Sequence, residues 1–161
     1  MFATSPRAEY LVLRAGTAAD VMTPNPMSIR AEATVAEAVA ALTDRGFGAA
    51  PVIDEAGRPV GVISGADLLL HDREHMTHMA RNPEPAEVPE GFEVEDADPT
   101  LVADVMTPAV FGVRPETPMP EVVERMLALR VHHLFVIDEG GALIGVISPL
   151  DVLRALKRET A

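Results

Sequence analysis

Two short stretches of the chain end in the same pair of side chains, a serine followed three residues later by an aspartate. They are Gly61-Val62-Ile63-Ser64-Gly65-Ala66-Asp67 and Gly145-Val146-Ile147-Ser148-Pro149-Leu150-Asp151. In each, an apolar run typical of a buried strand leads into the serine, and the aspartate falls in the first turn of a predicted helix. These paired elements are the strongest candidates for chemistry. A carboxylate in a first turn also stabilises its own helix, so a structural role stays open.

The two stretches lie 84 positions apart, and the same offset aligns the rest of the two halves without a gap. Each half is predicted to fold as helix–strand–helix–strand–strand–helix. In the first half we expect helices at 17–21, 34–45 and 66–80 and strands at 27–30, 49–54 and 60–64. In the second half we expect strands at 111–114, 133–138 and 143–148, a helix that begins near Thr117, and a last helix at 149–158.

The predicted fold class is α+β, with two repeats that pack through their sheets with pseudo-twofold symmetry. A three-stranded sheet covered by helices on one face cannot bury both surfaces alone, which explains the duplication. The predicted organisation is an N-terminal tail at 1–16, a first repeat at 17–80, a linker at 81–99 and a second repeat at 100–161. The linker is rich in proline and acidic residues, and it either spaces the repeats or docks a partner.

Composition excludes several classes of function. The 161 residues carry a formal net charge of −12, which disfavours nucleic acids and anionic membrane surfaces as partners. The sequence contains no apolar run long enough for a membrane-spanning helix and no secretory signal, so a cytoplasmic location is expected. It also contains no cysteine, which excludes disulfides and thiolate metal sites. No nucleophile–base pair or glycine-rich phosphate loop stands out, and the chain is therefore predicted not to be an enzyme.

Taken together, the motifs resemble a tandem pair of cystathionine-β-synthase (CBS) domains, known as a Bateman module. The resemblance rests on the two Ser/Asp elements, on the Asp-Val-Met-Thr-Pro sequences that begin at Asp20 and Asp104, and on the Val-Ile-Asp strand ends at Asp54 and Asp138. It implies a regulatory protein that binds AMP, ADP, ATP or S-adenosylmethionine, alone or with Mg²⁺, in clefts between the repeats. It also implies a homodimer that pairs through its helices and a regulated partner protein.

In such a module, each cleft takes a threonine and short-strand residues from one repeat and the Ser/Asp element of the other. One cleft would contain Thr23, Met27, Ser28, Val146, Ser148, Leu150 and Asp151. The other would contain Thr107, Phe111, Gly112, Val62, Ser64, Ala66 and Asp67. An aspartate can accept hydrogen bonds from ribose hydroxyls, and the serine and first-turn amides can donate to phosphate. Phe111 is bulky for a residue that flanks adenine, and it could partly close the second cleft.

His132 and His133 resemble the basic pair that contacts ligand phosphate in this family, and they would serve the cleft of Asp151. The first repeat has Gly48 and Ala49 at the matching positions, so the Asp151 cleft is expected to bind phosphorylated ligands more tightly. Alternatively, one imidazole packs in the core and the other is solvated. A further set of histidines shares one face of the predicted helix at 66–80, at His71, His75 and His78. They form either a polar face or a metal site, and no metal is predicted.

The leading functional prediction is therefore a non-catalytic sensor of adenine nucleotides that signals by a conformational change. Two alternatives stay open. One is a ligand-free scaffold for protein–protein interaction, and the other is a sensor of S-adenosylmethionine.

Overall fold

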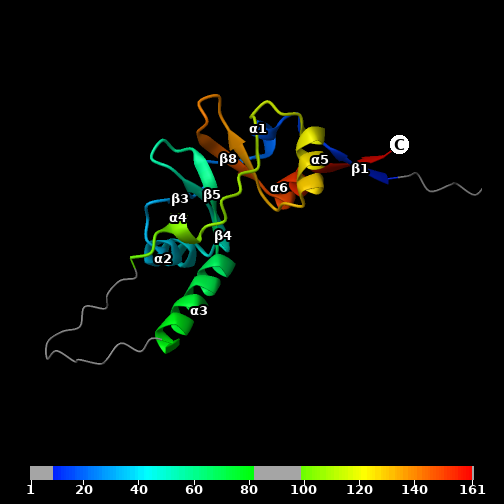
Figure 1. Ribbon diagram of the computed structural model, residues 1–161. Coiled ribbons are helices and arrows are strands. Elements are labelled where there is room, and N and C mark those ends of the chain that lie inside the picture. The colour runs from blue at the N-terminus through cyan, green and yellow to red at the C-terminus, as the bar shows by residue number, and fades with distance from the viewer. Residues whose placement is uncertain (1–8, 82–98, 161) are drawn as a thin grey trace, which may run out of the picture. The chain divides into compact units, whose positions relative to one another are not determined.

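The computed structural model describes residues 9–81 and 99–160, which form two compact units of mixed α and β structure (Figure 1). Unit 1 combines the described residues up to Pro26 with those from Phe111 onward, and unit 2 contains Met27–Val110. The two repeats are present, but each unit contains one repeat together with a segment of the other. Most of the predicted linker lies outside the described residues, as does the first half of the predicted tail.

The sheet of unit 1 has four strands in the order β2-β8-β7-β6. Three of them come from the second repeat: β6 (Gly112–Val113), β7 (Leu134–Ile137) and β8 (Leu143–Ile147). The fourth, β2 (Thr23–Pro24), comes from the first repeat and pairs antiparallel with β8. The helices of this unit are α1 (Ala18–Val21), α5 (Met119–Leu129) and α6 (Pro149–Arg154).

The sheet of unit 2 has the order β3-β4-β5, with strands β3 (Ile29–Arg30), β4 (Ala49–Ile53) and β5 (Pro59–Ser64). Its helices are α2 (Val35–Arg45), α3 (Gly65–Arg81) and α4 (Val102–Val105). Thr34 and Glu37 form the predicted capping box at the start of α2, and Gly46 ends this helix in the left-handed conformation. The second repeat contributes a bridge between Thr107 and Val62, which corresponds to the β2–β8 pairing of unit 1.

The two hydrophobic cores follow the 84-residue offset of the sequence. The buried core of unit 1 consists of Ala18, Val113, Met119, Val122, Met126, Leu134, Val136 and Ile147. The buried residues at the equivalent positions of unit 2 are Val102, Ile29, Val35, Ala38, Leu42, Ala50, Val52 and Ile63. Each core thus takes one residue, Ala18 or Val102, from the short helix of the other repeat. The duplicated pattern of apolar residues therefore encodes two cores that exchange a segment.

The ends of the chain differ from the prediction. Residues 9–16 were predicted to belong to a tail, but Glu9–Leu13 forms strand β1. The last helix was predicted to reach 158, but α6 ends at Arg154, and Leu156–Thr160 forms strand β9 instead. The two strands pair antiparallel over five residues, from Glu9 opposite Thr160 to Leu13 opposite Leu156. The helix prediction failed because pairing with a strand from the other end of the chain outweighs local helix propensity.

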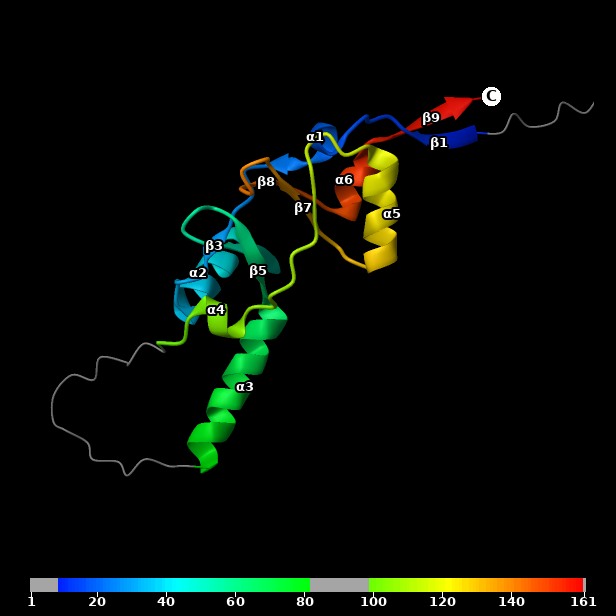
Figure 2. The ribbon, with the colours of Figure 1, turned by 45° about the horizontal axis from the view of Figure 1, so that its top comes forward.

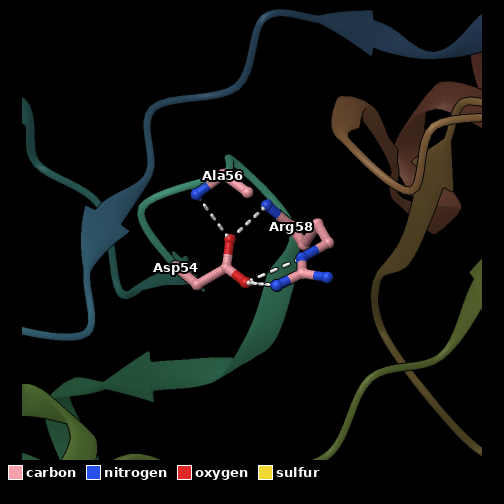
Figure 3. A network of polar contacts seen from close by, with 3 residues as sticks. All are labelled: Asp54, Ala56 and Arg58. Atoms are coloured by element: carbon pink, nitrogen blue, oxygen red, sulfur yellow. Dashed lines mark hydrogen bonds and ion pairs between the residues drawn. The ribbon is translucent and has the colours of Figure 1, made fainter.

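The turn that joins β4 to β5 is organised by the carboxylate of Asp54 (Figure 3). Its Oδ1 atom accepts hydrogen bonds from the backbone N–H groups of Ala56 and Arg58, both at 2.9 Å. Its Oδ2 atom forms an ion pair with the Arg58 guanidinium at 2.8 Å. In the second repeat, Asp138 Oδ1 accepts a similar hydrogen bond from the N–H of Ala142 at 2.8 Å. The conspicuous Val-Ile-Asp ends of these strands therefore have a structural role.

These contacts make the stability of the hairpin depend on pH. The backbone hydrogen bond from Arg58 lowers the pKa of Asp54, and the Arg58 side chain lowers it further. Since this pKa is lower in the folded chain than in the unfolded chain, the stabilisation is present at neutral pH and is lost in acid. We expect Asp54→Asn to lower the thermal midpoint at pH 7 and to lose less stability than the wild type on acidification. Thermal unfolding of both proteins across the acid range measures this, and a constant difference between them would contradict it.

Candidate functional site

The Ser/Asp element of the second repeat forms a capping box at the start of α6. Asp151 Oδ2 accepts hydrogen bonds from the backbone N–H of Ser148 at 2.8 Å and from Ser148 Oγ at 2.7 Å. In return, Ser148 Oγ accepts a hydrogen bond from the N–H of Asp151 at 3.3 Å. Asp151 Oδ1 lies 3.5 Å from Arg154 Nη1, and only 11% of the Asp151 side chain is exposed. Asp151 therefore has a structural role in the helix cap, and its Oδ1 atom faces an arginine whose side chain is mostly exposed.

The Ser/Asp element of the first repeat has the same geometry at the start of α3. Asp67 Oδ2 accepts hydrogen bonds from the backbone N–H and from Oγ of Ser64, at 2.8 Å and 2.6 Å. Its Oδ1 atom differs from that of Asp151, because it accepts a hydrogen bond from Thr107 Oγ1 at 3.3 Å. The carboxylate oxygen of Asp67 that lies outside the capping box therefore has a hydrogen-bond partner within the protein.

Both threonines predicted for the clefts lie beside the Ser/Asp element of the opposite repeat. Thr23 is the register partner of Val146 in unit 1. In unit 2, Thr107 and Val62 exchange two backbone hydrogen bonds of 2.9 Å. The glycines that begin the two elements allow this approach. A Cβ atom at Gly61 would lie 2.6 Å from the Thr107 carbonyl oxygen, and one at Gly145 would lie 2.4 Å from Met22 Sδ.

A cleft of about 570 Å³ opens beside Asp151 in unit 1. Its lining includes two carboxylates and three cationic side chains: Asp20, Asp151, Arg14, Arg154 and Lys157. The volume is within the usual range of small-molecule sites. None of the three cations was predicted from the sequence. The position of Arg154, three residues after Asp151 on the same helix, is a signal that could have been used. Arg14 and Lys157 come from opposite ends of the chain, and only the pairing of β1 with β9 brings them together.

Asp20 closes one side of this cleft, and its carboxylate is committed to the start of α1. Its Oδ2 atom accepts hydrogen bonds from the N–H groups of Thr17 at 2.8 Å and Gly16 at 3.0 Å. These hydrogen bonds lower the pKa of Asp20, so the group stays ionised at neutral pH. The cleft therefore combines negative charges with cations on long side chains, of which Arg14 is paired with Glu159 and Arg154 with Asp151.

The two predicted phosphate-binding histidines face different surroundings. His132 lines a groove between α5 and α6 together with apolar side chains such as Leu127 and Val152. His133 lies within the electrostatic influence of Asp151. Partial burial lowers the pKa of His133, the neighbouring His132 lowers it further, and the Asp151 carboxylate opposes both effects. The structure thus associates His133 with the surroundings of Asp151.

The remaining predicted residues divide between the two units. Val146, Ser148 and Leu150 lie in unit 1 with Asp151, and Val62, Ser64 and Ala66 lie in unit 2 with Asp67. Four others belong to the opposite unit from the cleft predicted for them: Met27 and Ser28 are in unit 2, and Phe111 and Gly112 are in unit 1. The assignment of these four residues to the clefts stays a prediction.

Two of the histidines of α3 lie near each other on the helix. The rings of His71 and His75 have centroids 6.2 Å apart and are tilted by 33°. Within 9–81 and 99–160, no group of three or more His, Cys, Asp or Glu side chains is placed to hold a metal ion. Over the same residues, no helix is both long and apolar enough to cross a membrane.

Comparison with known proteins finds relatives that are CBS-domain proteins or transporters. The chain is 30% identical over 159 residues to the CBS domain-containing protein CBSX2, chloroplastic, of Arabidopsis thaliana, covering 89% of this chain and 66% of that protein. It is 32% identical over 152 residues to the magnesium transporter MgtE of Thermus thermophilus, covering 88% of this chain and 27% of the transporter. The chain spans between 57% and 66% of the length of CBSX2 and two other matched relatives.

Solved structures give the same result. The crystal structure of CBSX2 in complex with AMP superposes with a TM-score of 0.66 at 28% identity, over 88% of this chain and 96% of that one. The cytosolic domain of MgtE in complex with ATP gives a TM-score of 0.64 at 29% identity, over 86% and 48% of the two chains. The sequence model of the CBS domain matches this chain twice, at residues 18–74 and 102–158. The chain therefore belongs to the CBS-domain family and contains a tandem pair of these domains.

Proposed function

We propose that this chain is a non-catalytic regulatory module that binds an adenine nucleotide, AMP, ADP or ATP, and signals its presence to a partner protein by a conformational change. The cleft beside Asp151 is the proposed primary site. The observation that carries the proposal is the combination, in one cleft, of three cationic side chains with a carboxylate whose Oδ1 atom lies outside the capping box and faces only the exposed side chain of Arg154. The nucleotides named in the titles of the CBSX2 and MgtE structures support the choice of ligand class.

In the proposed complex, Asp151 Oδ1 accepts a hydrogen bond from a ribose hydroxyl, because Oδ2 is engaged in the capping box. Arg154 lies 3.5 Å from Oδ1 and is 69% exposed at its side chain, so it can turn toward a phosphate. Arg14 and Lys157 supply two further charges from the same cleft. Charge-assisted hydrogen bonds of this kind are stronger than neutral ones. Mg²⁺ could accompany a nucleotide with several phosphates without any protein ligand of its own.

The element at Asp67 is proposed as the weaker site. Its available oxygen accepts a hydrogen bond from Thr107, which a ribose hydroxyl would have to displace. The first repeat also has Gly48 and Ala49 where the second has its two histidines. We therefore expect one nucleotide to bind per chain at low ligand concentration. Of the residues predicted from the sequence for the primary site, Asp151 is the one that lines the cleft, together with Arg14, Arg154 and Lys157. The other predicted residues are retained as proposals for the two sites.

Calorimetric titration of nucleotide-stripped protein with AMP, ADP, ATP and S-adenosylmethionine tests the proposal. We expect Asp151→Asn to weaken nucleotide binding about 10- to 100-fold, since a hydrogen bond to a charged group contributes about 1.5–3 kcal/mol. Asp67→Asn is the matched control, because it removes the same charge from the same kind of capping box in the other unit. Equal affinities of the two variants and the wild type would refute the site.

The same panel separates the alternatives. Binding of S-adenosylmethionine in preference to the nucleotides would identify a different sensor that uses the same carboxylate. An absence of binding heat and of thermal stabilisation by every ligand would favour the ligand-free scaffold.

Nucleotide affinity is expected to increase in mild acid through His133. The pKa of this side chain is lowered, so the imidazole is neutral at pH 7 and gains its charge only below the ordinary value of about 6.5. A positive charge beside Asp151 would attract phosphate and strengthen binding as the pH falls. We expect the affinity of the wild type to rise on acidification and that of His133→Gln to change less. Parallel pH titrations of ATP binding measure the difference, and identical profiles would exclude a role for His133.

The homodimer and the cytoplasmic location predicted from the sequence are retained as proposals. Helices α5 and α6 border an open groove of about 500 Å³ with a largely apolar lining. Leu127 and Leu153 beside it are 72% and 60% exposed. Burial of such side chains against a second copy would favour pairing through these helices.

A further inference from the structure

The ribbon of β1 and β9 extends from unit 1 as a sheet of only two strands (Figure 2). A two-stranded ribbon is marginally stable in water unless further strands or a hydrophobic surface support it. Leu13 packs against the core of unit 1 at the base of the ribbon. Farther out, Tyr10 and Leu11 are 56% and 65% exposed. The outer part of the ribbon therefore presents apolar side chains with no cover in the described part of the chain.

The hydrogen-bond pattern identifies which backbone groups of β1 point away from β9. The N–H of Arg14 donates to the carbonyl of Ala155 at 2.9 Å. In an antiparallel pair, hydrogen-bonded and non-hydrogen-bonded residues alternate. The backbone N–H and C=O groups of Val12 and Tyr10 therefore also face β9. Those of Leu11 and Leu13 point toward the outer edge of the ribbon.

The two outer edges of the ribbon differ in charge. The edge of β9 carries three consecutive charged residues, Lys157, Arg158 and Glu159, of the kind that protects strand edges from association. The edge of β1 carries the uncharged run Tyr-Leu-Val-Leu at 10–13, and its one charged residue, Glu9, is the first of the strand. If two β9 strands paired about Arg158, two guanidinium groups would face each other, which is unfavourable. If two β1 strands paired about Leu11, no charges of the described side chains would oppose each other.

We propose that β1 pairs antiparallel with β1 of a second copy of this chain, about a two-fold axis that passes through Leu11. The outward N–H and C=O groups of Leu11 would bond to those of the same residue in the second copy. Tyr10 would lie opposite Val12 of the second copy, an aromatic–β-branched pair that stabilises sheets. The two ribbons would become one four-stranded sheet in the order β9-β1-β1-β9, with charged residues on both of its outer edges. This contact is separate from the helix surface and does not require nucleotide.

Disulfide trapping tests the register, because the natural chain has no cysteine. In Leu11→Cys, the two Cα atoms at the axis would be about 5.5 Å apart, within the range that a disulfide spans. Arg158→Cys is the matched control, since Arg158 is the register partner of Leu11 on the opposite edge of the same ribbon. The Cα atoms of position 158 in the two chains would be three strand spacings apart, about 14 Å, which is too far for a disulfide. We expect covalent dimers of Leu11→Cys and none of Arg158→Cys under mild oxidation.

Sedimentation of Leu11→Lys provides a second measurement on the full chain. This substitution would place two ammonium groups opposite each other at the axis, and it leaves the bonds between β1 and β9 intact. The particle mass is expected to fall to half that of the wild type at the same concentration. If the helices also pair and the two contacts close into a tetramer, the same factor of two applies. The proposal is overturned if the mass does not change, if the wild type is a monomer, or if Arg158→Cys forms a disulfide as readily as Leu11→Cys.

Discussion

Leu134→Ala is expected to lower the free energy of unfolding by about 2–5 kcal/mol, the usual cost of removing a buried leucine side chain. Leu134 is fully buried in unit 1, in the same core cluster as Met119, Val122 and Ile147. The equivalent position of unit 2 holds Ala50, beside the smaller Ala38 in place of Val122. Each core is therefore matched to its own set of side chains, and an alanine that fits in unit 2 would leave a cavity in unit 1.

Denaturant unfolding and thermal midpoints measure this effect, with a fall of about 4–20 °C expected for a protein of this size. Glu124→Ala is the control, because Glu124 is exposed on α5 of the same unit and lies outside the groove that Leu127 borders. Its substitution should change the free energy of unfolding by no more than about 0.5 kcal/mol. Similar losses in both variants would show that the core of unit 1 does not depend on the packing described here.

Gly61→Ala is expected to destabilise unit 2 by about 1–3 kcal/mol through overpacking. The new Cβ would lie 2.6 Å from the carbonyl oxygen of Thr107 and 2.8 Å from Met106 Sδ. The methionine can move, but the carbonyl belongs to the bridge with Val62. Separation of the two segments would also weaken the hydrogen bond from Thr107 to Asp67. The substitution should therefore change the Asp67 element as well as the stability of the unit.

Gly48→Ala is the matched control in the same unit. A Cβ at this position would meet no atom within 4 Å, and the backbone does not require a positive φ. Alanine there should be neutral or should stabilise the protein by up to about 1 kcal/mol, since it restricts the unfolded chain. Chemical unfolding of both variants measures the difference. A Gly61→Ala protein as stable as Gly48→Ala would mean that Thr107 can withdraw from Val62 without cost.

The sequence was informative wherever a signal was local. The capping box at Thr34, the left-handed turn at Gly46 and the two hairpins depend on residues a few positions apart, and the structure contains all of them. The pairing of β1 with β9 joins residues from the two ends of the chain. No periodicity within a short window reports such a contact. Only Ala155 and Leu156 are apolar between Arg154 and Thr160, so no apolar periodicity distinguishes a helix from a strand there.

The same distinction applies to the candidate site. The offset of 84 residues identified the two Ser/Asp elements and their threonines, and the structure places each threonine beside the element of the opposite repeat. The asymmetry of the two carboxylates was not visible in the sequence. It depends on the position of the Thr107 hydroxyl and on which cations surround Asp151. Arg14 could be assigned to that cleft only once the terminal strands were known to pair.

The exchange of segments between the repeats also affects the order in which the chain can fold during synthesis. When the first repeat leaves the ribosome, Val102 and Thr107 are still missing from its unit, and β1 and β2 have no partner strands. At about 5–20 residues per second, Tyr10 would wait roughly 7–30 s for Glu159, its partner in β9. The first repeat therefore exposes unpaired strand edges until the second repeat has been synthesised. A cut between the repeats would leave two fragments that each lack part of both cores. Neither repeat would therefore contain a complete hydrophobic core when it is separated from the other.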